Sequence, residues 1–123
     1  MNKISKESIV GVDIYDYLGK NYMAVMSYDK WRVAYLNHGD RVEEKSFHRI
    51  ERNMQTDEVF VLLERKATLI IGLELNKIEM IPHKVYNVPK GVWHHIITKE
   101  ETRVLVIENE DTCDKNSEYM SID

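Results

Sequence analysis

The sequence of 123 residues contains one cysteine and two prolines. A single cysteine cannot form an intrachain disulfide, and a lone thiol suits a reducing compartment. Cys113 has several acidic neighbours and no adjacent histidine, and acidic neighbours disfavour the reactive thiolate. We therefore expect no catalytic role for Cys113.

Long hydrophobic runs are missing as well. The longest, residues 59–63, is far shorter than the ~20 apolar residues that a membrane-spanning helix needs. Residues 1–10 contain lysines but lack the apolar segment of a signal peptide. We expect a soluble, cytoplasmic protein with no membrane partner.

Positive charge is sparse and scattered. The 21 Asp and Glu residues outnumber the 17 Lys and Arg residues, for a net charge of −4. Domains that bind nucleic acid usually present a basic patch or stripe, and the sequence contains no cluster of this kind. It therefore predicts no nucleic-acid partner.

The periodicity of an amphipathic helix is also absent, and short β-rich segments separated by turn residues take its place. Tight turns are expected near the Asn76-Lys77 and Pro89-Lys90-Gly91 sequences. Many short strands with regular turns are typical of an all-β sandwich or barrel. The expected strands cover residues 22–27, 32–37, 46–52, 58–64, 68–75, 77–81, 85–88, 94–98 and 104–108.

The chain has the length of one domain, residues 1–123. We expect a core over about residues 20–109, preceded by an N-terminal arm (residues 1–19) and followed by a polar C-terminal tail (residues 110–123). Apolar side chains near the end, such as Tyr119 and Met120, could pin the tail onto a sheet, or the tail could fray.

The segment 58–63 is apolar on both faces. Phe60 and Leu62 alternate with Val59, Val61 and Leu63, and successive strand residues point to opposite faces. Such a strand is covered on both sides, either by a loop or by a second subunit. We expect a homodimer.

Residues 56–64 (Thr-Asp-Glu-Val-Phe-Val-Leu-Leu-Glu) and 89–94 (Pro-Lys-Gly-Val-Trp-His) resemble the two sequence motifs of the cupin family. The resemblance extends over residues 51–107, about half of the chain, with a short connection between the motifs. It implies a small single-domain bacterial cupin: a double-stranded β-helix, or RmlC-like jelly-roll barrel, in a family that is often dimeric. Family members include dioxygenases, isomerases, epimerases and sugar-binding domains, so the fold does not select one chemistry.

The metal site implied by the resemblance is altered. Cupins commonly hold a divalent metal on three histidines and one glutamate, and here only Glu58 and His94 remain. The paired histidines of the first motif are replaced by Glu51 and Asn53, or by Arg52 and Met54 if the spacing is one residue shorter. Arg65 and His83 stand where the motifs have glycine.

A metal bound by Glu51, Asn53, Glu58 and His94 would have three oxygen ligands and one nitrogen ligand. Such a set suits Mn²⁺ or Mg²⁺ better than Zn²⁺, and the loss of two imidazoles weakens it. We expect no firmly bound cofactor, with a weakly bound divalent metal (Mn, Fe, Ni or Zn) as the alternative.

The inward-facing register of residues 51–54 stays open, because a slip of one residue exchanges the two faces of a strand. In the second register, Arg52 and His48 face inward and form a cationic, metal-free site for a carboxylate or phosphate. Tyr35 and Trp93 are the aromatic candidates for a ligand-binding face.

Glu58 and His94 are the candidate catalytic residues. A carboxylate inside a barrel is costly unless it is paired or binds a metal, and a buried Glu–His pair can serve as general acid and base. The leading hypothesis is a barrel that binds a small polar or anionic, sugar-like ligand. The alternatives are a metal-independent sugar isomerase or epimerase that uses Glu58 and His94, and a weak-metal cupin enzyme or dioxygenase.

Overall fold

The computed structural model describes residues 3–110 and 114–122, so Cys113 lies outside the described part of the chain. The described residues form strands, with two short 3₁₀ helices (η1, Glu44–Ser46, and η2, Asp114–Asn116). None of their helices has the length and hydrophobicity of a membrane span. The strands are β1 (Ile4–Ile9), β2 (Val12–Tyr17), β3 (Asn21–Tyr28), β4 (Trp31–Asn37), β5 (Arg49–Asn53), β6 (Glu58–Glu64), β7 (Ala67–Ile71), β8 (Asn76–Glu79), β9 (Val85–Val88), β10 (His94–Thr98), β11 (Arg103–Asn109) and β12 (Ser117–Ser121).

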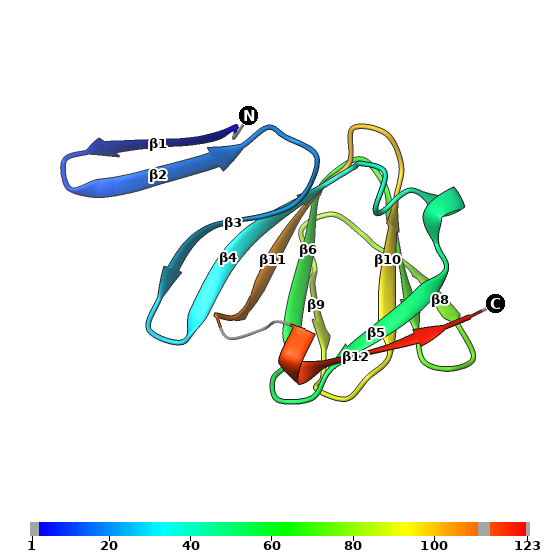
Figure 1. The fold of residues 1–123 in the computed structure, drawn as a ribbon. Helices are drawn as coiled ribbons and strands as arrows, with labels where there is room; N and C mark the ends of the chain where they lie inside the picture. The colour runs from blue at the N-terminus through cyan, green and yellow to red at the C-terminus, as the bar shows by residue number, and fades with distance from the viewer. Residues whose placement is uncertain (1–2, 111–113, 123) are drawn as a thin grey trace.

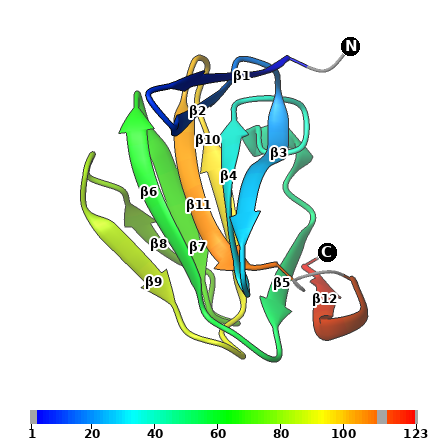
Figure 2. The same cartoon turned by 90° about the vertical axis from the view of Figure 1, so that its left-hand side faces the viewer.

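Two five-stranded antiparallel sheets form the body of the molecule (Figure 1). The β11 sheet has the order β3-β4-β11-β6-β9, and the β10 sheet has the order β12-β5-β10-β7-β8. Figure 2 looks onto the β11 sheet, with strands of the β10 sheet behind it. From β4 to β12 the chain crosses between the sheets at every connection except that from β7 to β8, as in a jelly roll, and the expected all-β architecture is confirmed.

The hydrophobic core fills the space between the sheets. Side chains that alternate along each strand supply it, so every second residue is buried, as in the pattern of β11. The cluster consists of Ala34, Leu36, Val42, Phe60, Leu62, Ala67, Leu69, Met80, Val88, Ile96, Val104 and Val106.

Most of the predicted strands agree closely with the structure, and the strands over residues 58–64, 85–88 and 94–98 have the predicted bounds. The turn between β7 and β8 is four residues earlier than predicted. Gly72 has a φ of +79° and Leu75 a φ of +55°, and the Leu75 N–H donates to the Gly72 carbonyl oxygen at 3.1 Å. The apolar residues around this turn imitate the pattern of a continuing strand. The first predicted residues of the strand over 46–52 likewise lie outside β5, which begins at Arg49.

The two positions where cupin motifs have glycine keep a glycine-like backbone. Arg65 has a φ of +71° and His83 a φ of +75°, in the left-handed region that side chains other than glycine rarely adopt. The agreement at both positions supports the alignment of the two motifs with this chain.

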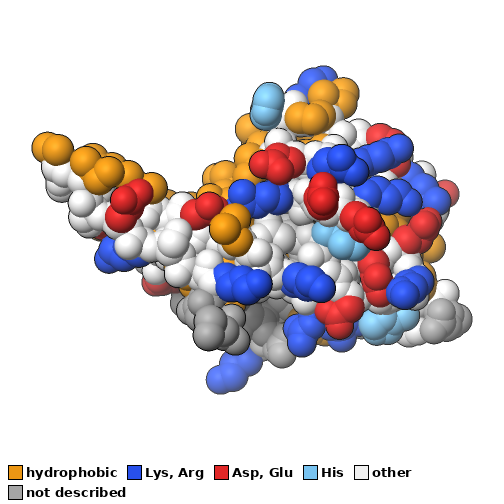
Figure 3. Space-filling view, turned by 90° about the horizontal axis from the view of Figure 1, so that it is seen from above, with side chains coloured by type: hydrophobic (Ala, Val, Ile, Leu, Met, Phe, Trp, Pro, Cys, Tyr) orange, Lys and Arg blue, Asp and Glu red, His pale blue; other side chains and the backbone are white. Residues whose placement is uncertain are grey.

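The N-terminal arm is a β-hairpin, although the sequence analysis placed no strand there. Strands β1 and β2 form a two-stranded sheet that projects from the body (Figure 1). Hydrophobic side chains lie towards its free end (Figure 3), and Val10 at the turn is 99% exposed. The arm mixes polar and apolar residues and buries little apolar surface, so its sequence gives only a weak signal for strands.

The polar tail pairs with the body instead of fraying, which is the first of the two alternatives that the sequence left open. Strand β12 pairs with β5 along its whole length, with Tyr119 opposite Glu51 and Met120 opposite Ile50. The tail therefore forms the edge of the β10 sheet next to the functional site.

Strand β6 is apolar on both faces, as the sequence indicated. Phe60 and Leu62 are buried between the sheets, whereas Val59, Val61 and Leu63 are half-buried on the outer face. The homodimer stays a prediction.

The base of the arm depends on a close approach at Gly19. A Cβ atom at this position would lie 2.2 Å from the hydroxyl oxygen of Tyr17, whose side chain is buried and donates a hydrogen bond to the Lys20 carbonyl oxygen at 2.8 Å. We expect Gly19→Ala to displace this ring and lower the free energy of unfolding by about 1–3 kcal/mol, as measured by urea denaturation. Lys20→Ala, a change of an exposed residue in the same turn, serves as the control. Equal stability of both variants would contradict the argument.

Candidate functional site

A cavity of about 890 Å³ lies between the sheets. It is on the side where β3 and β4 face β5 and β12, and its walls combine carboxylates, arginines, histidines and tyrosines with apolar core residues. A volume of this size is typical of small-molecule sites in proteins. The mixed lining suits a ligand with both polar and apolar surfaces.

The register of β5 places Glu51 in this cavity. Glu51 is the Cα partner of His94 on β10, and both residues line the cavity. Ile50 and Arg52 point to the opposite face, because neighbouring residues in a strand alternate. The first of the two registers left open by the sequence is therefore adopted.

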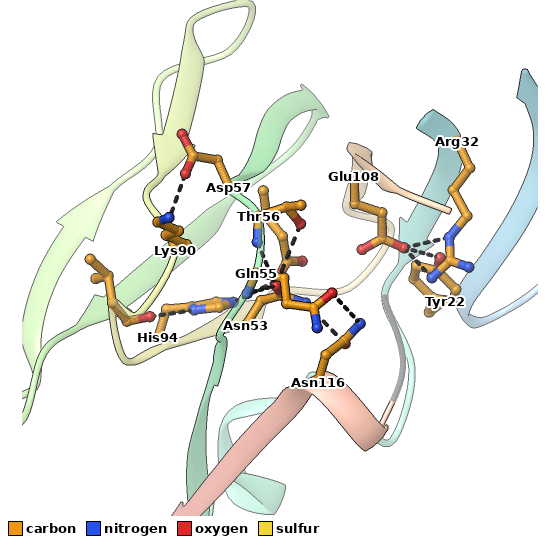
Figure 4. A network of polar contacts seen from close by, with 12 residues as sticks. Tyr22, Arg32, Asn53, Gln55, Thr56, Asp57, Lys90, His94, Glu108 and Asn116 are labelled. Carbon is orange, nitrogen blue, oxygen red and sulfur yellow. Dashed lines mark hydrogen bonds and ion pairs between the residues drawn. The ribbon is translucent and has the colours of Figure 1, made fainter. Parts of the chain in front are cut away.

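The imidazole of His94 is held in one orientation. Its Nδ1 atom lies 3.0 Å from the Val92 carbonyl oxygen (Figure 4), which can only accept a hydrogen bond, so Nδ1 carries a proton. The other nitrogen, Nε2, lies 3.4 Å from the Glu58 Oε1 atom. Nε2 and Oε1 thus lie within ion-pair distance, and a proton on Nε2 faces the Glu58 carboxylate.

A second polar group faces this pair from β11. Glu108 is 7% exposed, accepts a hydrogen bond from the Tyr22 hydroxyl, and pairs with the Arg32 guanidinium at 2.7 Å (Figure 4). Charged hydrogen bonds of this kind compensate part of the cost of burial. Tyr22, Arg32 and Glu108 all line the cavity.

Burial controls the proton affinities of the site. It raises the pKa of Glu51, and the nearby negative charge of Glu58 acts in the same direction. Burial also raises the pKa of Glu108, against the opposing hydrogen bonds from Tyr22 and Arg32. For His94, burial lowers the pKa, but the hydrogen bond and charge of Glu58 outweigh it, so the net pKa is raised.

Asn53 is occupied by the adjacent turn. Its Oδ1 atom accepts hydrogen bonds from the backbone N–H groups of Gln55 at 2.9 Å and Thr56 at 2.8 Å (Figure 4), and its side chain does not line the cavity.

Glu51, Glu58 and His94 of the predicted metal set thus line the cavity without Asn53. Among residues 3–110 and 114–122, no three His, Cys, Asp or Glu side chains form a group suited to one metal ion. The donor set therefore does not fit the metal site of the fold.

The predicted ligand-binding residues are dispersed. His48 lines the cavity, whereas Arg52, Tyr35 and Trp93 do not. The guanidinium of Arg52 lies over the Trp93 ring at 4.4 Å and pairs with Glu118 at 2.6 Å. Tyr35 is covered by Arg103, 4.8 Å from its ring centroid. Arg52 and Tyr35 belong to outer surfaces of the sheets because their strand positions alternate with inward-facing ones. Trp93 lies just before β10.

Sequence reasoning missed Tyr22, Arg32 and Glu108. Glu108 carried a signal, since it continues the buried series Val104 and Val106 at a spacing of two along β11. A charged residue at an inward position of a strand indicates a functional or paired group. Its partners could not be found this way, because Tyr22 is 86 residues away in the sequence.

His95 also lines the cavity and is half-buried, in apolar surroundings. Its ring stacks on Phe47 with 4.6 Å between centroids, and its Nε2 atom has no hydrogen-bond partner among the described residues. Burial, reinforced by the positive charges of His94, His48 and Arg49, lowers the pKa of His95 to about 4.

The comparisons with known proteins concern the fold. The sequence matches no protein-family model and no curated protein sequence. Among solved structures, a cupin-2 domain protein from Shewanella frigidimarina is 21% identical, with a TM-score of 0.58 over 76% of this chain and 85% of that chain. The Streptomyces nucleoside dehydratase Pac13 is 8% identical, with a TM-score of 0.65 over 97% of this chain and 86% of that chain. The iron(II) form of HppE is 12% identical, with a TM-score of 0.59 over 88% of this chain and 56% of that chain.

The chain therefore has a cupin fold, as its two motifs indicated. Neighbours with this fold include enzymes, and identities this low extend the likeness to the fold alone.

Two substitutions test whether Asn53 serves the turn. We expect Asn53→Ala to lower the free energy of unfolding by about 2 kcal/mol, because two backbone N–H groups lose their acceptor. Asn53→Asp keeps an acceptor oxygen and should lose less. Urea denaturation measures both, and equal losses would contradict the proposed role.

His95 gives a pH-dependent prediction. The unfolded chain binds a proton at this residue below its ordinary pKa of 6.5, whereas the folded chain does so only near 4, so its contribution to stability is lost as the pH falls through this window. We expect His95→Phe, which keeps the stack on Phe47, to gain stability over the natural chain between pH 7 and pH 5. The gain is on the order of 1 kcal/mol after allowance for solvent screening.

Urea denaturation at several pH values measures this difference. Leu73→Ser, a change of an exposed residue without a titratable group, is the control, and its difference from the natural chain should stay constant over this range. A difference for His95→Phe that stays constant from pH 7 to pH 5 would rule out the proton linkage.

Proposed function

We propose that the protein binds a small hydroxylated ligand, the size of a sugar or nucleoside, between its two sheets. The Glu58–His94 pair moves a proton to or from this ligand. The single observation that carries the proposal is the locked imidazole, whose Nδ1 donates to a backbone carbonyl while its Nε2 faces the Glu58 carboxyl group.

The composition of the cavity supports a hydroxylated ligand. Carboxylates accept hydrogen bonds from hydroxyl groups, and Glu51, Glu58 and Glu108 line the cavity. Phe60, Ile96 and Val106 supply apolar surface for the carbon skeleton. Such a mixture of apolar walls and a few polar groups is typical of small-molecule sites.

The geometry of the Glu58–His94 pair supports proton transfer to or from the ligand. His94 is 4% exposed, so its Nε2 atom and the Glu58 oxygen exchange one proton away from bulk water. The pair could take a proton from a C–H or O–H group of the ligand and return it at another position. This is the chemistry of a metal-independent isomerase or epimerase, and also of a dehydratase. Pac13, a nucleoside dehydratase that has been solved with uridine, is an example of such an enzyme with a similar fold.

A metal-dependent enzyme is the second candidate. HppE, a neighbour with a similar fold, has been solved with iron(II). The use of Asn53 in the turn argues against this candidate. Titration with Mn²⁺, Fe²⁺, Ni²⁺ and Zn²⁺ tests it, since a stoichiometric metal that is lost in His94→Ala would revive it.

Glu58→Gln tests the proposed function. Ligand-observed NMR with a panel of free sugars and nucleosides should detect binding to the natural chain, and any hit is then assayed for turnover by NMR. Glutamine keeps the shape of the side chain and can still contact His94, but it cannot exchange the shared proton. We expect turnover to fall at least about 100-fold.

Glu100→Gln, a change of an exposed carboxylate, is the matched control and should leave binding and turnover unchanged. Equal binding and turnover in both variants would mean that the Glu58–His94 pair has no role.

A further inference from the structure

The cavity is lined by basic residues at β5 and in the loop after β4, together with the exposed carboxylate Asp40. Arg49 and His48 are exposed and line the cavity, and Arg41 lines it from the loop after β4. Among the described residues, no carboxylate forms an ion pair with Arg41 or Arg49. Arg32, by contrast, is already bound to Glu108.

Arg49 is oriented by an aromatic ring. Its guanidinium lies over the ring of Tyr119 on β12, with 4.1 Å between the guanidinium carbon and the ring centroid. A guanidinium stacked in this way keeps the N–H groups on its edge available for an oxyanion. Strand β12 thus positions a cation at the mouth.

His48 presents one free ring nitrogen beside Arg49. Its Nδ1 lies 2.8 Å from the Ser46 carbonyl oxygen, so Nδ1 is the donor there and Nε2 remains for other contacts. When protonated, Nε2 is a second donor to an anion.

The spacing along β5 relates this cationic group to the acid–base pair. Arg49 and Glu51 are two residues apart and both line the cavity, which places their Cα atoms about 7 Å from each other. Glu51 is in turn opposite His94. The distance from Arg49 to the pair is therefore close to the length of one sugar ring and its substituents.

We infer that the natural ligand carries a phosphate group, which binds to Arg49 and His48 at the cavity mouth. This inference rests on the proposed function, because the remainder of the ligand extends inward to Glu58 and His94. The carboxylates Glu51, Glu58 and Glu108 repel an anion from the interior, so the charges determine which end of the ligand enters. A phosphate group can accept more hydrogen bonds from Arg49 and His48 than a carboxylate, which has only two oxygens.

Inorganic phosphate is the probe that tests this subsite, with acetate as the carboxylate probe. In a ¹H–¹⁵N NMR titration, phosphate should shift the backbone signals of residues 48–51 with saturation, and more weakly bound acetate should shift them less. Arg49→Gln should weaken phosphate binding at least about tenfold, which corresponds to the loss of one charged hydrogen bond. Arg65→Gln removes an exposed arginine that does not line the cavity and should change nothing.

Several outcomes would overturn the inference. These are no saturable shift with phosphate, equal binding by Arg49→Gln and Arg65→Gln, or acetate binding as tightly as phosphate. His48→Gln provides a second variant, and it should also weaken phosphate binding. Circular dichroism of each variant establishes that it is folded.

The failure of this inference can be separated from failure of the proposed function. Glu58→Gln should retain phosphate binding while it loses turnover of a panel compound, so the two readouts report on the two proposals separately. Matched pairs such as uridine and uridine monophosphate then report the subsite directly, since the phosphate should improve binding in the natural chain and in Glu58→Gln but not in Arg49→Gln.

Discussion

Three carboxylates lie between the two sheets, and the residues around them offset the free-energy cost of their burial. A buried carboxylate loses its hydration and must be paired, hydrogen-bonded or protonated. Glu108 is tied to Tyr22 and Arg32, Glu58 to His94, and the pKa of Glu51 is raised by burial. The strands that bring these partners together come from both sheets. The polar site and the jelly roll therefore depend on the same registers.

The same constraint separates this site from the metal centre suggested by its fold. Where that centre would have histidines on β5, this chain has Glu51, which faces the cavity, and Asn53, which stabilises a turn. What remains next to Glu51 and Glu58 is the imidazole of His94, within ion-pair distance of Glu58. The acid–base chemistry proposed above rests on this pair.

Local patterns predicted much of the fold. The strand from Glu58 to Glu64 alternates strongly enough to have correct bounds, and the motif around His94 predicted that this residue faces inward. The hairpin of β1 and β2 escaped detection because it buries little surface. The turn at Gly72 was misplaced because Leu73 and Leu75 resemble a continuing strand although Leu73 is 64% exposed.

The site was less accessible to sequence reasoning, because its partners are brought together by long-range pairing. Glu58 and His94 could be proposed from their motifs, but the pairing of Tyr22 with Glu108 joins the two ends of the body. Arg52 was a reasonable anion ligand by residue type, and only the register of β5 shows that Arg49 lines the cavity and Arg52 does not. Residue type thus indicates the chemistry, whereas strand register decides which residue performs it.

The hairpin arm of β1 and β2 has a different relation to the rest of the chain. It is held at its base, where Asn37 donates to the carbonyl oxygens of Tyr17 and Gly19 and Arg103 binds Asp16. A two-stranded hairpin is marginally stable in water by itself. The arm therefore forms a separate cooperative unit, which can open and close many times while the barrel stays folded. Its amide hydrogens exchange with solvent at a rate set by this local opening, and changes in the stability of the barrel scarcely affect that rate.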